Sequence, residues 1–181
     1  LQGTIPGDIE KLANLKVLAL DGNDLTSGLH TVFHLLHLEE IYLGFNSLND
    51  GLDNSSFERL TNLNVLDLKS NKIHGPFPDA LWTLTNLQVV DVHAHALDGH
   101  INDLATAHPI QFLDVSENFL GGGLPASMGT FMTDLTHLDL TSNRFEQELP
   151  TDLAALTKME TLLLSDNSMF GPQPIPEWLQ G

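Results

Sequence analysis

LNVLDLKSNKIHGPFPDALWTL, residues 63–84, contains both halves of the unit that decides the fold of this chain. Its first half follows the pattern L-x-x-L-x-L-x-x-N, in which apolar residues alternate as on a β-strand with one buried face. Its second half has a glycine and two prolines followed by leucines three residues apart, which favours an extended turn and then a short helical turn. The segment therefore predicts one strand and one outer-wall turn.

The strand half of this unit recurs seven times in 181 residues. The copies begin at Leu15, Leu38, Leu63, Leu87, Ile110, Leu135 and Met159. One short strand cannot bury its apolar face alone, but stacked units form a continuous sheet and core. The repeats therefore predict an α/β solenoid with a concave parallel sheet and with short helical turns, 3-10 turns or loops on the convex side. We expect residues 1–181 to form a single repeat domain of about seven repeats.

An asparagine ends the strand half in six of the seven copies. Its side-chain amide can bond backbone groups that have left the sheet and would otherwise be buried without partners. The seventh copy has His95 at this position, which we expect to point inward in place of the asparagine. The predicted asparagine ladder consists of Asn23, Asn46, Asn71, Asn118, Asn143 and Asn167.

The outer-wall halves connect the chain with a known family. Residues 73–84 and 1–12 fit L-x-G-x-I-P-x-x-L-x-x-L best, and with the strand half this pattern resembles the plant-specific class of leucine-rich repeats. Such repeats occur in ectodomains of receptor-like kinases, in receptor-like proteins and in polygalacturonase-inhibiting proteins. The resemblance covers essentially the whole chain and implies a right-handed, curved solenoid with a second, lateral set of short strands. It specifies fold better than function, because all these groups share the scaffold.

Several features depart from that class. Three repeats replace the Ile-Pro pair with Leu29-His30, Leu52-Asp53 and Ile101-Asn102, so we expect the lateral sheet to be interrupted there. The cysteine-bearing caps common in the class are missing, and both ends of the sequence lie inside outer-wall halves. We interpret the chain as a fragment cut at both ends, because a solenoid needs polar caps. The alternative is that its open ends stack on another copy.

The charge of the chain restricts its partners. Seven Lys and Arg residues stand against 24 Asp and Glu, which gives a formal charge of −17. Nucleic acid is excluded as a partner because its binding depends on basic groups that replace counterions, and anionic membranes are disfavoured for the same reason. No apolar run is long enough to span a bilayer. Cationic proteins, neutral glycans, polyamines and Ca²⁺ remain open, and the acidity could also serve solubility alone.

Four aspartates occupy the same concave position in successive repeats: Asp67, Asp91, Asp114 and Asp139. At a strand spacing of ~4.8 Å, neighbouring carboxylates repel by roughly 0.9 kcal/mol even in water. A cation would relieve this repulsion, or local donors such as Ser116 or Thr141 could satisfy the carboxylates instead. The predicted ligand-binding face comprises Glu40, Tyr42, Asp67, Lys69, Asp91, His93, Phe112, Asp114, Glu117, His137 and Asp139.

Motifs for catalysis or cofactor binding are missing from the sequence. It has no phosphate loop, no H-E-x-x-H and no G-x-S-x-G, and the glycines at 121–123 lie in the repeat register with Pro125 opposing a helix start. His30, His34 and His37 have helical spacing, but a full helix is not expected on the outer wall. We therefore predict no enzyme activity, no cofactor and no metal ligands. Asn54, in Asn54-Ser55-Ser56, is a candidate for N-glycosylation.

Together these features predict a recognition module of an extracellular or cell-surface protein, receptor-like or adhesive. It would bind a protein, peptide or glycan, with basic ligands among the options, through its concave and lateral face. The extracellular location follows from the family resemblance. Two alternatives are a secreted inhibitor of a cell-wall-degrading enzyme and a structural solenoid that self-associates end to end.

Overall fold

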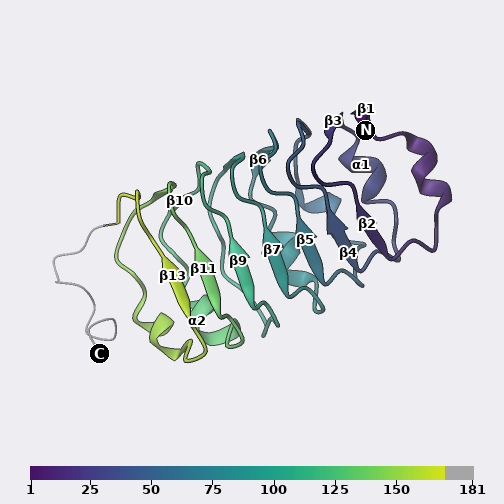
Figure 1. Ribbon diagram of the computed structural model, residues 1–181. Coiled ribbons are helices and arrows are strands. Elements are labelled where there is room, and N and C mark those ends of the chain that lie inside the picture. The colour runs from purple at the N-terminus through teal and green to yellow at the C-terminus, as the bar shows by residue number, and fades with distance from the viewer. Residues whose placement is uncertain (170–181) are drawn as a thin grey trace.

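The computed structural model describes residues 1–169, which form an elongated solenoid of stacked turns (Figure 1). One parallel sheet of seven strands lines one side, in the order β13-β11-β9-β7-β5-β4-β2. Each strand comes from one of the predicted repeats: β2 (Val17–Ala19), β4 (Glu40–Tyr42), β5 (Val65–Asp67), β7 (Val89–Asp91), β9 (Phe112–Asp114), β11 (His137–Asp139) and β13 (Thr161–Leu163). The predicted fold class is confirmed.

The register of this sheet pairs equivalent positions of successive repeats. Leu66 pairs with Val90, Val90 with Leu113, and Leu113 with Leu138, and all four are fully buried. The residues on either side of them face outward from the sheet, as the alternation of a strand requires. Side chains at one repeat position therefore form straight rows across neighbouring strands.

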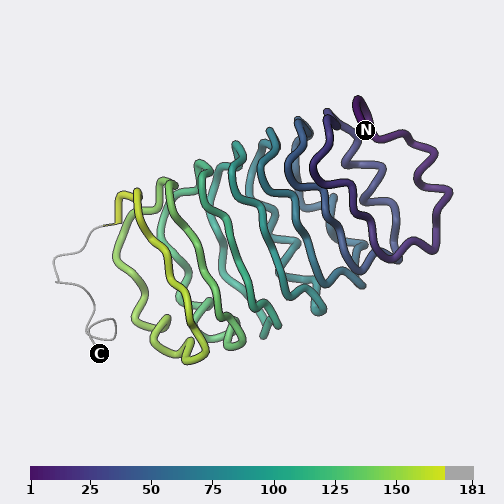
Figure 2. The backbone as a smooth tube through the Cα atoms, viewed as in Figure 1, coloured from purple at the N-terminus to yellow at the C-terminus, as the bar shows by residue number. Residues whose placement is uncertain are grey.

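The opposite wall consists of short helical turns, as the sequence predicts. The smooth trace in Figure 2 follows the chain from each strand through this wall to the next strand. The turns are the 3-10 helices η1 (Gly7–Lys11), η2 (Asn54–Ser56), η3 (Asp79–Thr83) and η4 (Thr151–Ala155) and the α-helices α1 (Leu29–Val32) and α2 (Ser127–Phe131). A helix this short leaves most of its backbone groups without helical partners, so packing on the core stabilises it.

The lateral strands form three separate pairs, β1 (Gln2–Thr4) with β3 (Asp24–Ser27), β6 (His74–Pro76) with β8 (Ala96–Asp98), and β10 (Gly121–Gly122) with β12 (Arg144–Phe145). The lateral sheet is therefore interrupted, as expected. The expected places were partly wrong, because the repeats beginning at Leu15 and Leu87 have lateral strands although they lack Ile-Pro. These strands end before the Ile-Pro position, so their pairing does not depend on the proline.

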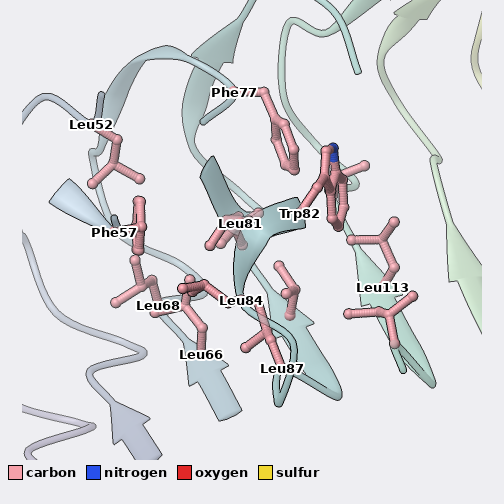
Figure 3. Close-up of a cluster of buried hydrophobic side chains, with 14 of the residues drawn as sticks. Leu52, Phe57, Leu66, Leu68, Phe77, Leu81, Trp82, Leu84, Leu87 and Leu113 are labelled. Carbon is pink, nitrogen blue, oxygen red and sulfur yellow. The ribbon is translucent and has the colours of Figure 1, made fainter. Parts of the chain in front are cut away.

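The core fills the space between the sheet and the outer wall. Figure 3 shows strand leucines such as Leu66 and Leu113 together with Phe57, Leu81 and Leu84 of the outer wall. Aromatic rings link neighbouring turns, with the centroids of Phe33 and Phe57 separated by 4.9 Å. Leu29, Leu52 and Ile101, which lack the following proline, are still buried at 1–3% exposure. The apolar side chain at this position therefore packs in the core whether or not a proline follows it.

Asparagines join each turn to the next. The Nδ2 group of Asn118 donates to the carbonyls of Val92, Val115 and Ser116 at 2.9–3.1 Å, and its Oδ1 accepts from the amide of Leu97 at 3.0 Å. One buried side chain thus satisfies four backbone groups of two repeats. Bonds of the same type are made by Asn46, Asn71, Asn143 and Asn167, whereas Asn23 of the first repeat donates only within its own turn.

The residue before each ladder position has left-handed backbone geometry, which the sequence does not reveal. Its φ is 52–58° in the six repeats with a side chain there, and 64° at Gly22. The six residues are Phe45, Ser70, Ala94, Glu117, Ser142 and Asp166. This conformation crowds Cβ against the backbone and costs roughly 1–2 kcal/mol for an L-residue. The strained conformation persists because it bends the chain out of the strand and directs the next residue, at the ladder position, toward the core.

Glycine should relieve this strain at Ala94. We expect Ala94→Gly to raise the free energy of unfolding by about 0.5–1 kcal/mol, because removing Cβ outweighs the added freedom of the unfolded chain. The matched control is Ala19→Gly in the extended strand β2, which should lower stability by about 0.5–1 kcal/mol. Urea unfolding of both variants checks the prediction, and a loss of stability in Ala94→Gly would contradict it.

Candidate ligand-binding face

The four aspartates form one row across the middle of the sheet. Asp67 pairs with Asp91, Asp91 with Asp114, and Asp114 with Asp139, on the adjacent strands β5, β7, β9 and β11 (Figure 1). Their side chains are mostly buried, with 16% of Asp67, 11% of Asp91 and 14% of Asp114 exposed. Carboxylates so far removed from water need hydrogen-bond or cationic partners.

A lysine occupies the first gap of this acidic row. The Nζ group of Lys69 lies 2.8 Å from Oδ2 of Asp67 and 3.3 Å from Oδ2 of Asp91. The hydrogen bond that Lys69 donates to Asp67 raises the pKa of Lys69, and the charges of both carboxylates add to the effect. The ammonium also lies 5.8 Å from the centre of the Phe45 ring. Lys69 is therefore held between two carboxylates and an exposed aromatic ring.

A histidine occupies the second gap. The Nδ1 atom of His93 lies 2.7 Å from Oδ1 of Asp91 and 3.5 Å from Oδ2 of Asp114. Lys69 and His93 stand at the same repeat position, two residues after the aspartate of their own strand. Because the sheet aligns equal repeat positions, acidic and basic side chains alternate along this part of the row.

The third gap, between Asp114 and Asp139, contains no ion pair within residues 1–169, although a nitrogen of His137 lies within 4.8 Å of an oxygen of each carboxylate. The amide and hydroxyl of Ser116 donate to Oδ1 of Asp114 at 2.9 and 2.6 Å, and the amide of Thr141 donates to Oδ1 of Asp139 at 2.8 Å. Within residues 1–169, Asp139 has no ion pair. Burial raises the pKa of Asp114, and the charges of Asp91 and Asp139 raise it further against the Ser116 bonds. Between Asp114 and Asp139 the negative charge is only partly compensated.

Aromatic side chains flank the acidic row. The rings of Phe112 and His137, on β9 and β11, are stacked with centroids 4.3 Å apart and planes 5° from parallel. At the other end, Tyr42 donates its hydroxyl to Oε2 of Glu40 at 2.8 Å, and this bond raises the pKa of Tyr42. The face therefore offers carboxylates beside flat rings, an arrangement suited to guanidinium and ammonium groups.

The remaining candidate residues lie elsewhere. Glu117 is exposed in the left-handed turn beyond β9, and in the described part of the chain it makes no ion pair or side-chain hydrogen bond with the row. His34 contacts Glu10 through Nδ1 at 2.8 Å, and His37 contacts the carbonyl of Ala13, so these histidines do not converge. Asn54 is exposed on the outer wall, and its Oδ1 accepts from the amide of Ala80.

Comparison with known proteins agrees with the solenoid fold. Residues 36–95 and 134–156 match two families described as leucine rich repeat. The chain is a leucine-rich repeat protein that resembles the plant-specific class. Receptor-like protein 39 of Arabidopsis thaliana is 31% identical over 146 residues, which are 80% of this chain and 16% of that protein. Receptor-like protein 35 of the same plant is 38% identical over 68% of this chain and 13% of its own length.

Solved structures of leucine-rich repeat ectodomains are also similar. The ectodomain of the Arabidopsis receptor kinase HAESA, solved with an IDA peptide hormone, superposes with a TM-score of 0.87 at 29% identity. The match covers 94% of this chain and 29% of that one. This leucine-rich repeat chain thus spans less than a third of the length of these relatives. No helix within residues 1–169 is both long and apolar enough to cross a membrane.

Proposed function

We propose that this chain is part of an extracellular recognition module of a receptor-like protein. Its acidic row, Asp67, Asp91, Asp114 and Asp139, contacts basic side chains of a peptide or protein ligand. The observation that carries the proposal is the third gap, because Asp139 makes no ion pair in the described part of the chain and Asp114 contacts a basic group only at the second gap, through Nδ1 of His93 at 3.5 Å. The relatives are receptor-like proteins, and RGFR1 and HAESA were solved with peptide hormones, which favours receptor-type recognition over enzyme inhibition or self-association.

The physical basis of this proposal is preorganisation. The carboxylates are fixed by backbone and hydroxyl donors on neighbouring strands, so they lose little conformational entropy on binding. A guanidinium placed between Asp114 and Asp139 would gain charge-assisted hydrogen bonds and could stack on the ring of His137. The net charge of −17 would attract such a ligand from a distance.

A peptide-display selection with a defined pair of variants tests the proposal. Peptides selected on the wild-type chain at low salt, with EDTA present, should be rich in Arg and Lys. Their affinity for Asp114→Asn/Asp139→Asn should fall by about 30-fold or more, the effect of removing a partner from a buried charge pair.

The control is Asp24→Asn/Asp98→Asn, which removes the same charge from exposed lateral strands and should change affinity far less. Equal losses of affinity in both double variants would show that only the net charge of the chain matters, and this would overturn the proposal. Unchanged affinity in Asp114→Asn/Asp139→Asn would overturn it as well.

A further inference from the structure

Three potential ligand atoms converge at the second gap of the acidic row. Oδ1 of Asp91, Nδ1 of His93 and Oδ2 of Asp114 lie within 4.8 Å of one another. His93 Nδ1 is 2.7 Å from the first carboxylate and 3.5 Å from the second. Two carboxylates and an imidazole from neighbouring strands thus point at a common centre.

Groups outside this cluster fix the direction of each carboxylate. Lys69 holds the other oxygen of Asp91, at 3.3 Å from its Oδ2. The amide and hydroxyl of Ser116 hold Oδ1 of Asp114. Each carboxylate therefore has one oxygen engaged by an outer partner and one oxygen facing the ring of His93. Outer partners of this kind orient the ligands of protein metal sites.

We propose that Asp91, His93 and Asp114 bind one divalent transition-metal ion of the zinc type. Imidazole with carboxylates suits Zn²⁺, whereas Mg²⁺ and Ca²⁺ prefer oxygen ligands throughout. With bonds of about 2.0–2.2 Å, ligand atoms of a tetrahedral zinc site lie roughly 3.3 Å apart. The His93–Asp114 separation already matches this value, and the His93–Asp91 separation needs to open by about half an ångström as the ion replaces the shared proton.

The charges at the site suit a divalent ion. Two carboxylates balance its charge, while the ammonium of Lys69 opposes it and is itself shared with Asp67. Three protein ligands leave a fourth position open, as in zinc sites that take up water or an external ligand. That open position lies on the same face as the proposed peptide site, but metal binding does not require the peptide.

A neighbouring group competes with this assignment. Asp114, His137 and Asp139 also have ligand atoms within 4.8 Å of one another. His137, however, is stacked flat on Phe112, and within the described residues it makes no hydrogen bond to either aspartate. Because both groups share Asp114, the structure assigns one ion per chain, with His93 rather than His137 as its nitrogen ligand.

Titration of the purified chain with ZnCl₂, followed by calorimetry without any peptide, tests the assignment. We expect one equivalent of Zn²⁺ to bind, with affinity at least about tenfold lower in His93→Gln and in Asp114→Asn. The matched control His137→Gln should keep wild-type affinity, and so should His34→Gln on the outer wall. Circular dichroism of each variant confirms that it is folded.

Co²⁺ provides a second readout, since a tetrahedral site with mixed ligands gives visible absorption that His93→Gln should lose. The assignment is overturned if the wild-type chain binds no stoichiometric metal, if His93→Gln binds as tightly as wild type, or if His137→Gln alone loses binding. The peptide experiment contains EDTA, so the failure of one proposal leaves the result of the other intact.

Discussion

Replacing Leu113 by alanine is expected to lower the free energy of unfolding by about 2–5 kcal/mol. Leu113 is fully buried on the central strand β9, between Val90 and Leu138 of the adjacent strands. The substitution removes buried methyl groups and leaves a cavity that the surrounding turns cannot fill. In a solenoid each turn packs only on its neighbours, so a defect in the middle weakens the coupling between the two halves.

Urea unfolding measures this loss, and Leu163→Ala is the matched control. Leu163 is 42% exposed on the edge strand β13, so the same chemical change should alter stability by only about 0.5 kcal/mol. Similar losses for both variants would mean that the central row of apolar residues is not packed as described. A gradual transition in Leu113→Ala, with its halves unfolding separately, would agree with the expected loss of coupling.

The repeat pattern predicts from the sequence that Leu113 is buried. The same periodicity predicts the acidic row. A residue one position after a buried strand residue must face the opposite side from the core, and equal repeat positions must align across strands. The order Asp67, Asp91, Asp114, Asp139 in the sheet follows from this rule alone. Periodicity therefore determines which side chains are neighbours on the face.

Periodicity did not reveal how those neighbours contact each other. That Lys69 bridges two aspartates, and that His93 lies between the next two, depends on side-chain rotamers and on donors such as Ser116. The cluster of Asp91, His93 and Asp114 was missed for this reason, because Asp114 approaches the other two only across strands. The left-handed turn at Ala94 was missed because its usual signal is glycine, and only the first repeat has one there. The lateral strands were partly misplaced because their pairing uses backbone groups, which leave little trace in the sequence.

His95 is the one interruption of the asparagine ladder, and its environment predicts a dependence of stability on pH. Its side chain is 8% exposed, its Nδ1 accepts from the amide of Asn71 at 3.3 Å, and its Nε2 has no hydrogen-bond partner in the described part of the chain. Its pKa is lowered to about 4, mainly by burial and in part by the charge of His93, while the charge of Asp91 opposes the shift. The folded chain therefore resists protonation of this ring.

The sign of the effect follows from the two pKa values. Above the unfolded value of 6.5 the ring is neutral in both states, so its titration costs no stability. As the pH falls from 6.5 to about 4, the unfolded chain takes up a proton that the folded chain does not. This difference removes about 3 kcal/mol of stability by the lower end of the range.

Replacement of His95 by asparagine should remove this loss and restore the ladder. At about pH 7.5, His95→Asn should be more stable than wild type by about 1–2 kcal/mol, because an amide can make ladder bonds like those of Asn118 and removes the unpaired buried Nε2 of the imidazole. The advantage should grow to roughly 4–5 kcal/mol near pH 4. Urea unfolding of both chains at the two pH values, with EDTA present, measures the difference. Other titrating groups act equally in the two chains and cancel, so a pH-independent difference would show that His95 is protonated in the folded state or is not buried.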